Sequence, residues 1–185
     1  MNENDLRIVK TKKALHHALL TLLKTKPLET ISVSTLCREA SVNRGTFYLH
    51  YTDVAALFDE HLQHLLKDLE DSYYEPYRHV TVINHKLLDP STIRLFHHVK
   101  KYQAFYEIVF DKKSSLSYYY SLFEKIKGLI LESTSANGGL DLFVISYTAN
   151  AIMGLIIQWS EEGFEHSPEY MNEKLSYILK TLDQG

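Results

Sequence analysis

Residues 31–51 read ISVSTLCREASVNRGTFYLHY, and this stretch decides the fold of the first part of the chain. The pattern predicts two short helices, 34–40 and 44–51, joined by a tight turn. Ser32 suits the cap of the first helix and Asn43 that of the second, because short polar side chains accept from free first-turn N–H groups. Two further sets of residues complete the pattern: an apolar set for a shared core (Leu36, Ala40, Val42, Phe47) and a polar set on the second helix (Arg44, Thr46, Tyr48, His50). This layout is typical of a helix-turn-helix, whose second helix lies in a DNA major groove.

The composition favours an all-α fold. The 185 residues are 45% hydrophobic and 23% charged, and only 7 glycines and 4 prolines interrupt them. Few breaks favour helices over a turn-rich β fold, and no sustained alternating pattern indicates a strand. We expect about nine helices: a three-helix head over residues 6–66, then a helical body over residues 67–185.

Charge is distributed unevenly. Residues 1–52 hold 8 Lys and Arg against 4 Asp and Glu (+4), and residues 53–185 hold 12 against 19 (−7), which together give the net −3. A basic head suits a polyanionic partner, although chance also produces an excess of this size. Within the head, Arg7, Lys10, Lys12 and Lys13 crowd the first helix, either as a solvated face or as phosphate contacts.

Several function classes lack their sequence signals. Cys37 is the single cysteine, so no intramolecular disulfide forms, and we expect a buried small residue in a cytoplasmic protein. No apolar run follows a basic patch at the start, so no signal peptide is predicted. The sequence contains no Gly-rich phosphate loop, no nucleophile motif and no set of His and Cys residues at the spacing of metal ligands. This argues against an enzyme, a cofactor or a metal. His61 and His64 alone supply too few metal ligands.

Helix signals continue along the chain. A helix over 6–25 ends at Lys26-Pro27, because the residue before proline avoids the α region. Thr52-Asp53 caps a long helix over 53–74, a rigid connector of about 30 Å. A loop over 75–86 follows. Helices then start at Asp89-Pro90, at Tyr102 and at Ser114 or Ser115, the last with an apolar stripe that includes Leu116 and Tyr120, and 133–139 forms a flexible connection.

The stretch 140–159 is the most apolar of the chain. Its length matches a transmembrane span, but five polar residues inside it and the lack of flanking basic residues argue against one. We expect a helix buried on several sides, one of them against another subunit. Gly163 suits its end, and Ser167-Pro168-Glu169 starts a last helix. The two helices are predicted to build a four-helix bundle with a second copy, and the alternative is that they only close the monomer's core.

Residues 6–66 resemble the tetracycline-repressor (TetR) family of bacterial transcriptional regulators. The matching features are Leu36, Ala40, residues 42–48, His50-Tyr51, Asp53 and Leu57. More weakly, MGLIIQWSEEGFEHSPEYM looks like the closing helices of a Firmicutes-type subgroup. The resemblance implies an all-helical homodimer that binds a near-palindromic double-stranded operator, as a repressor released by an effector.

Carried over by position, the resemblance implies that Arg44, Gly45 and Thr46 approach base edges, and that Tyr48 and His50 contact phosphates. It also implies that Ser32, Ser34 and Asn43 contact the DNA from the helix N-termini. The alternative for Tyr48 is that its ring packs between helices. Three residues depart from the family pattern: Ser41 stands at the usual turn glycine, Leu49 at a usually polar or aromatic position, and Val54 at a frequent lysine. Ser41 would carry strain in a left-handed conformation.

The resemblance further implies that the body, residues 67–185, is an effector-binding and dimerisation domain. Six aromatic residues are candidates to line a pocket: Tyr102, Phe105, Tyr106, Tyr120, Phe123 and Trp159. The alternative is that these residues only fill the core. Two other functions stay open, a co-regulator whose body binds a protein and a helical interaction protein that does not bind DNA.

Overall fold

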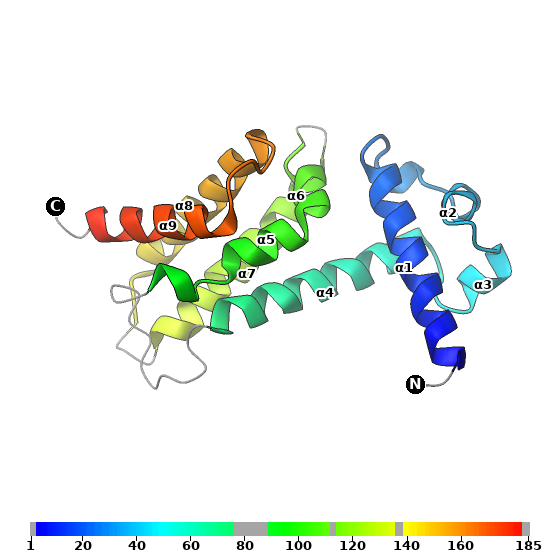
Figure 1. Ribbon diagram of the computed structural model, residues 1–185, viewed down its shortest axis with the longest axis horizontal. Helices are drawn as coiled ribbons and strands as arrows, with labels where there is room; N and C mark the ends of the chain where they lie inside the picture. Colours follow the sequence, from blue (N-terminus) through cyan, green and yellow to red (C-terminus); the bar gives the residue numbers. More distant parts are fainter. Residues whose placement is uncertain (1–2, 76–88, 112–113, 136–138, 183–185) are drawn as a thin grey trace. The chain divides into compact units, whose positions relative to one another are not determined.

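The computed structural model describes residues 3–75, 89–111, 114–135 and 139–182 (Figure 1). Within these ranges the chain forms nine α-helices and no strand. This confirms the predicted all-α class with about nine helices. The chain divides into two compact units, Met1–Leu65 and Leu66–Gly185.

The first unit holds α1 (Glu3–Leu23), α2 (Val33–Glu39), α3 (Arg44–Tyr48) and the beginning of α4 (Val54–Tyr74), with a 3-10 turn (Leu28–Thr30) between α1 and α2. Each helix contributes apolar side chains with no exposed surface: Leu15, Leu19, Leu36, Phe47, Leu57 and Leu65. These residues recur at helical spacing, so burying them fixes which face of each helix turns inward. Cys37 is also buried, as expected.

Two predictions about the helix-turn-helix were wrong in detail. Asn43 occupies the N-cap position of α3, but its side chain makes no capping hydrogen bond. Its exposed side chain leaves the first-turn amides of α3 uncapped. The helix also ends earlier than predicted, because the His50 amide bonds to the Phe47 carbonyl at 2.9 Å and tightens the last turn. The predicted cap of the long helix is confirmed, since Asp53 Oδ1 accepts from the Ala56 amide at 2.8 Å.

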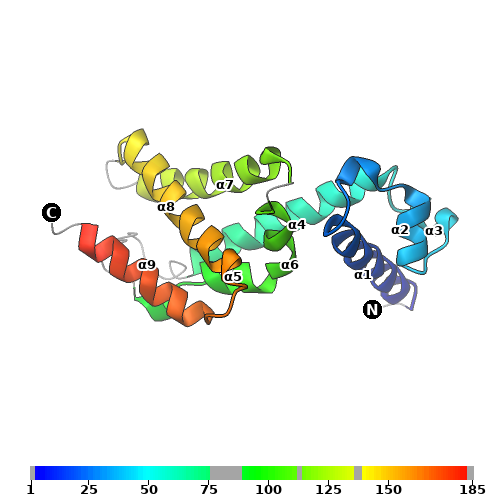
Figure 2. The same cartoon turned by 90° about the horizontal axis from the view of Figure 1, so that it is seen from above.

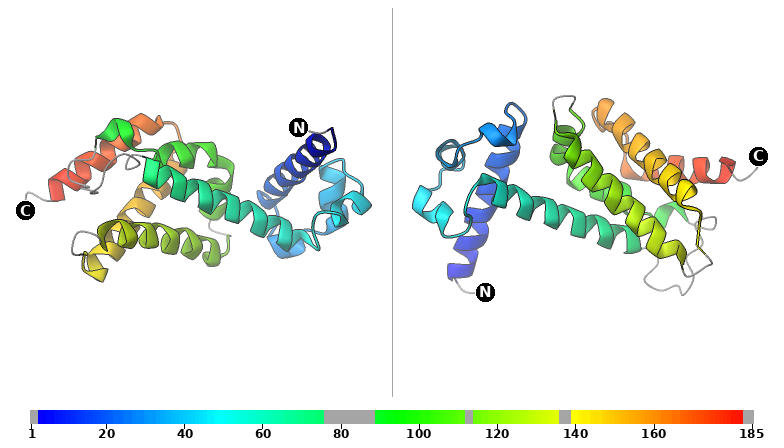
Figure 3. Two further views of the ribbon diagram at one scale, coloured as in Figure 1. Left: turned by 90° about the horizontal axis from the view of Figure 1, so that it is seen from below. Right: turned by 180° about the vertical axis from the view of Figure 1, so that it is seen from behind.

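The second unit holds the rest of α4, a 3-10 turn (Pro90–Thr92), α5 (Leu95–Lys101), α6 (Gln103–Val109), α7 (Leu116–Ser135), α8 (Leu142–Glu161) and α9 (Pro168–Leu182). α7 runs beside α8, and α9 lies against α5 (Figures 2 and 3). Asp89-Pro90 starts only the 3-10 turn, because the extended backbone at Ile93 interrupts the helix before Leu95. Most of the predicted loop, residues 76–86, lies outside the described residues.

α8 is buried along one face and exposed along the other. The buried side carries Ile145, Ala149, Ile152, Met153, Ile156 and Trp159. On the opposite side Phe143 is 86% and Tyr147 60% exposed. The helix is long and apolar enough to cross a membrane by length and composition, a test that core helices of soluble proteins also pass. Within the single chain α8 is therefore buried along one side, and the predicted burial of a further side against another subunit stays a prediction.

The turn after α8 follows the sequence signals. Gly163 has φ +66° and Phe164 φ +56°, and the Phe164 amide bonds to the Trp159 carbonyl at 2.8 Å. This is a Schellman ending, with the Phe164 ring packed edge-on against Trp159 at 5.1 Å. Ser167 Oγ then accepts from the Tyr170 amide at 3.2 Å and caps α9. Gly163 and Ser167 therefore have their predicted roles.

Candidate nucleic-acid interface

The N-terminus of α2 is capped by Ser32. Its Oγ accepts from the Thr35 amide at 3.2 Å and lies 3.0 Å from the Thr35 hydroxyl. Ser32 and Ser34 are both exposed at this helix end. First-turn amides carry partial positive charge, so two exposed hydroxyls beside them suit an anionic group such as a phosphate.

The turn between α2 and α3 places Ser41 in the left-handed region, at φ +53°. The Ser41 amide bonds to the Arg38 carbonyl at 3.2 Å, and the Val42 amide to the Cys37 carbonyl at 2.9 Å. These two bonds form a Schellman motif, in which glycine is the usual residue at this position. The strain predicted at Ser41 therefore has its geometric basis in the structure.

Exposure along α3 and its C-terminal turn repeats every four residues. Arg44 and Gly45 are exposed, as are Tyr48 and Leu49 one turn later, whereas Phe47 is buried. Thr46 and His50 are half-buried at the flanks. Four exposed residues at this spacing form one face, which we call the α3 outer face: Arg44, Gly45, Tyr48 and Leu49.

Tyr48 is 52% exposed and meets Phe47 edge-on at 5.5 Å. Leu49 is 79% exposed, which is high for a large apolar side chain. Sequence reasoning noted Leu49 as a departure but left it out of the candidate site. The signal that finds Leu49 is its spacing of four residues from Gly45, because residues four apart on a helix lie on the same face.

The half-buried carboxylate of Glu60 links α1 to α4 inside the first unit. Glu60 Oε1 accepts from Lys12 Nζ at 2.7 Å, and Glu60 Oε2 accepts from the Tyr51 hydroxyl and lies 3.3 Å from His16 Nε2. Burial would raise the pKa of Glu60, but the hydrogen bonds from Lys12 and Tyr51 outweigh it and hold that pKa at about 2. Lys12 therefore forms an ion pair within the first unit, whereas Arg7, Lys10 and Lys13 remain exposed.

The six candidate pocket residues fall into three separate aromatic groups. Tyr106 is fully buried beside Phe105, and the Tyr102 ring lies tilted against the His98 ring, with centroids 4.8 Å apart. Trp159 is packed between Phe96 and Phe164 and donates its Nε1–H to the His166 carbonyl at 3.2 Å. Phe123 stacks on Tyr119, while Tyr120 is 57% exposed. The effector pocket built from these six residues stays a prediction.

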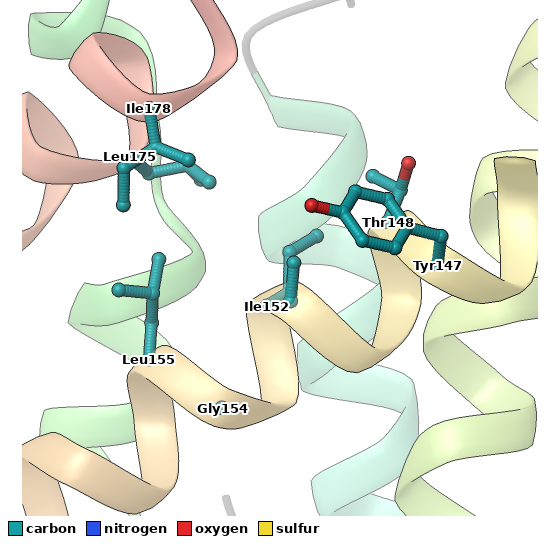
Figure 4. Close-up of a pocket in the computed structure, with 8 residues that line it drawn as sticks. Tyr147, Thr148, Ile152, Gly154, Leu155, Leu175 and Ile178 are labelled. Atoms are coloured by element: carbon teal, nitrogen blue, oxygen red, sulfur yellow. The ribbon is translucent and has the colours of Figure 1, made fainter. Parts of the chain in front are cut away.

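A different set of residues lines an apolar groove between α8 and α9. It has a volume of about 220 Å³ and is lined by Tyr147, Thr148, Ala151, Ile152, Gly154, Leu155, Leu175 and Ile178. Leu155 points from α8 toward Leu175 and Ile178 on α9 (Figure 4). A Cβ built at Gly154 would meet no atom within 4 Å, so packing within the chain does not require glycine there.

The helical architecture, with a helix-turn-helix in its first unit, is that of a transcriptional regulator. A TetR-type family model, described as the C-terminal region of transcriptional regulators, matches residues 87–181, just over half of the chain. The chain belongs to the TetR family of transcriptional regulators.

Two further comparisons find similar proteins. An uncharacterised HTH-type transcriptional regulator, YxbF of Bacillus subtilis (strain 168), is 19% identical over 160 residues, which are 85% of this chain. The chain spans only 42% of the length of that relative. The fold also matches the fatty acid degradation regulator FadR from Bacillus halodurans (TM-score 0.65, 12% identity, 92% of this chain and 94% of that one). A second match is the dihydroxyacetone kinase operon activator DhaS (TM-score 0.60, 20% identity, 93% of this chain and 95% of that one).

Proposed function

We propose that the α3 outer face binds the major groove of a DNA operator. The observation that carries this proposal is the four-residue repeat of exposure, which turns Arg44 and Tyr48 outward while Phe47 anchors the helix. An exposed arginine can donate two hydrogen bonds to O6 and N7 of a guanine. Gly45 lets the backbone come near the bases, and a Cβ built there would meet no atom within 4 Å.

The flanking residues position the head on the phosphates. Ser32, Ser34 and Asn43 lie at the N-termini of α2 and α3, where amide dipoles favour anions. Tyr48 and His50 reach phosphate oxygens, and half-buried Thr46 reaches a base edge beside Arg44. Such contacts fix the register of the protein, while base edges carry the sequence information.

The regulator acts as a homodimer through α8 and α9. The support is the uncovered apolar face of α8, with Phe143 86% and Tyr147 60% exposed, beside the α8–α9 groove. Monomeric proteins rarely leave such a contiguous apolar face in water. A twofold dimer presents two heads to two half-sites, so its operator is near-palindromic.

The regulator represses by occupying its operator, and an effector bound in the second unit releases it. A ligand shifts a protein between two states only through unequal affinity for them. DhaS, which shares the fold, is named an operon activator, so the sign of regulation needs its own measurement. Transcription from promoters beside the bound sites, compared between a deletion strain and its parent, provides it. Higher transcription in the deletion strain is expected, and lower transcription would identify an activator.

A salt titration tests the DNA-binding proposal. Binding of the full chain to random duplex should weaken steadily as salt rises, because Lys and Arg release counterions from the phosphates. Genomic footprinting of the bound protein then gives the operator. If the chain does not bind duplex DNA, or binds it independently of salt, the proposal is rejected in favour of a helical interaction protein.

A further inference from the structure

Leu49 is an apolar side chain on a face otherwise built to meet polar groups. It follows α3 with helical backbone angles (φ −69°, ψ −19°), and its amide bonds to the Gly45 carbonyl at 3.3 Å. That bond places Leu49 one turn beyond Gly45 on the α3 outer face. The folded unit leaves 79% of its surface exposed, so packing inside the unit does not account for a leucine here.

The chemistry of the side chain limits what it can recognise on DNA. Leucine neither donates nor accepts a hydrogen bond, so the donors and acceptors of base edges offer it nothing. In the major groove the apolar group on a base edge is the C5-methyl of thymine. A 5-methylcytosine carries the same group. We infer that Leu49 reads a pyrimidine 5-methyl group in the operator, an inference that rests on the proposed DNA-binding function.

The expected contribution to sequence preference is moderate. Burying one methyl group between Leu49 and a base changes affinity roughly fourfold. A dimer reads two half-sites, so the effects combine to roughly fifteenfold for the whole operator. In this arrangement Arg44 selects a guanine through hydrogen bonds, and Leu49 contributes a preference for a methylated pyrimidine at a neighbouring position. The two residues therefore specify different bases by different chemistry.

The test uses duplexes that the wild-type full chain selects from a random-sequence pool. Each selected duplex is resynthesised with deoxyuridine in place of thymidine, which removes only the methyl groups. A parallel series carries 5-methyldeoxycytidine in place of deoxycytidine. If Leu49 contacts the methyl group of thymine, wild type should bind the deoxyuridine duplex roughly fifteenfold more weakly than the selected duplex. If Leu49 contacts the methyl group of 5-methylcytosine, wild type should bind the methylated duplex more tightly than the selected duplex.

Variants assign the effect to Leu49. Leu49→Ala should bind all versions of the duplex equally, and its thermal unfolding should match wild type because the truncated side chain is exposed. Leu116→Ala is the matched control, since Leu116 on α7 is 70% exposed and lies outside the head. It should keep the methyl sensitivity of wild type.

The outcomes separate this inference from the proposed function. Wild type that binds the selected duplexes with equal affinity in all three forms overturns the role of Leu49 while DNA binding stands. The same conclusion follows if Leu49→Ala keeps the full methyl sensitivity. If the pool yields no enriched duplex, DNA binding itself fails, and the role of Leu49 fails with it.

Discussion

The imidazole Nδ1 of His98 lies 2.7 Å from Oδ2 of Asp68, and its Nε2 lies 3.1 Å from the Tyr106 hydroxyl. The His98 side chain has no exposed surface. Burial lowers the pKa of His98 to about 4 against the opposing effect of Asp68, so the ring is neutral at pH 7. A neutral ring has one donor and one acceptor, so Nδ1–H donates to Asp68 and the Tyr106 hydroxyl donates to Nε2. This chain of hydrogen bonds ties α4 to α5 and α6 within the second unit.

Tyr106→Phe should destabilise the protein by about 1–2 kcal/mol, because it leaves His98 Nε2 buried without its donor while preserving the ring. Urea unfolding of the full chain measures the loss. Tyr120→Phe is the matched control, since Tyr120 is 57% exposed on α7 and should change stability by less than about 0.5 kcal/mol. Equal stability of Tyr106→Phe and wild type would show that the hydroxyl contributes nothing to the buried chain.

Stability should fall as pH drops from about 6.5 toward about 4. In this window the unfolded chain protonates its histidines, whereas burial lowers the pKa of His98 and of His61 to about 4 in the folded state. The unfolded state then binds more protons than the folded state, so the free energy of unfolding decreases as the pH falls. Each histidine contributes up to about 1.4 kcal/mol per pH unit. Glu60, with its pKa held at about 2, stays ionised throughout the window.

Urea midpoints at about pH 7.5 and about pH 5 check this dependence. The His61→Leu variant should show a smaller change between the two conditions, because one of the two histidines with a lowered pKa is gone. A wild-type midpoint that is the same at both pH values would contradict the folded-state pKa values of both histidines.

Local signals predicted the head better than the body. The spacing of Leu36 and Phe47, the Asp53 cap and the strained turn at Ser41 all act over a few residues, so one sequence suffices to predict them. Asn43 failed as a cap because many residues can occupy an N-cap without bonding an amide. In the body, Leu116 and Tyr120 fit a helical stripe but are exposed, because their burial depends on which helices pack against α7. Periodicity alone contains no such information.

Ser41→Gly should stabilise the first unit by about 0.5–1 kcal/mol. Glycine removes the cost of a side chain at φ +53°, partly offset by the greater freedom of the unfolded chain. Thermal unfolding of the full chain provides the measurement. Ser34→Gly is the control, because Ser34 lies inside α2, where glycine should cost about 0.5–1 kcal/mol relative to a good helix former. Destabilisation by Ser41→Gly would mean that the Ser41 side chain makes a compensating contact.

Arg44→Ala should weaken binding to the footprinted operator by about 1–3 kcal/mol and relax the preference at one base position. Arg38→Ala provides the comparison, because Arg38 is also exposed but belongs to the last turn of α2 and not to the α3 outer face. Any loss of affinity in Arg38→Ala should be the same for the operator and for random duplex. Titrations against the operator and single-base variants of it measure both effects. Arg44 loses its assigned role if its variant keeps the base preference of wild type.

Gly154→Glu should convert the dimer to monomers that remain folded. A Cβ at Gly154 meets no atom within 4 Å of the same chain, and glutamate is a better helix former than glycine. Within one subunit the change is therefore tolerated, but between two α8 helices it places a charge in an apolar contact. Gly128→Glu on α7 is the matched control, because a Cβ there also meets no atom within 4 Å. Sedimentation velocity should report monomers for the first variant and dimers for the second, with helical content unchanged in both. Dimers in both variants would place the interface elsewhere than on the α8–α9 face.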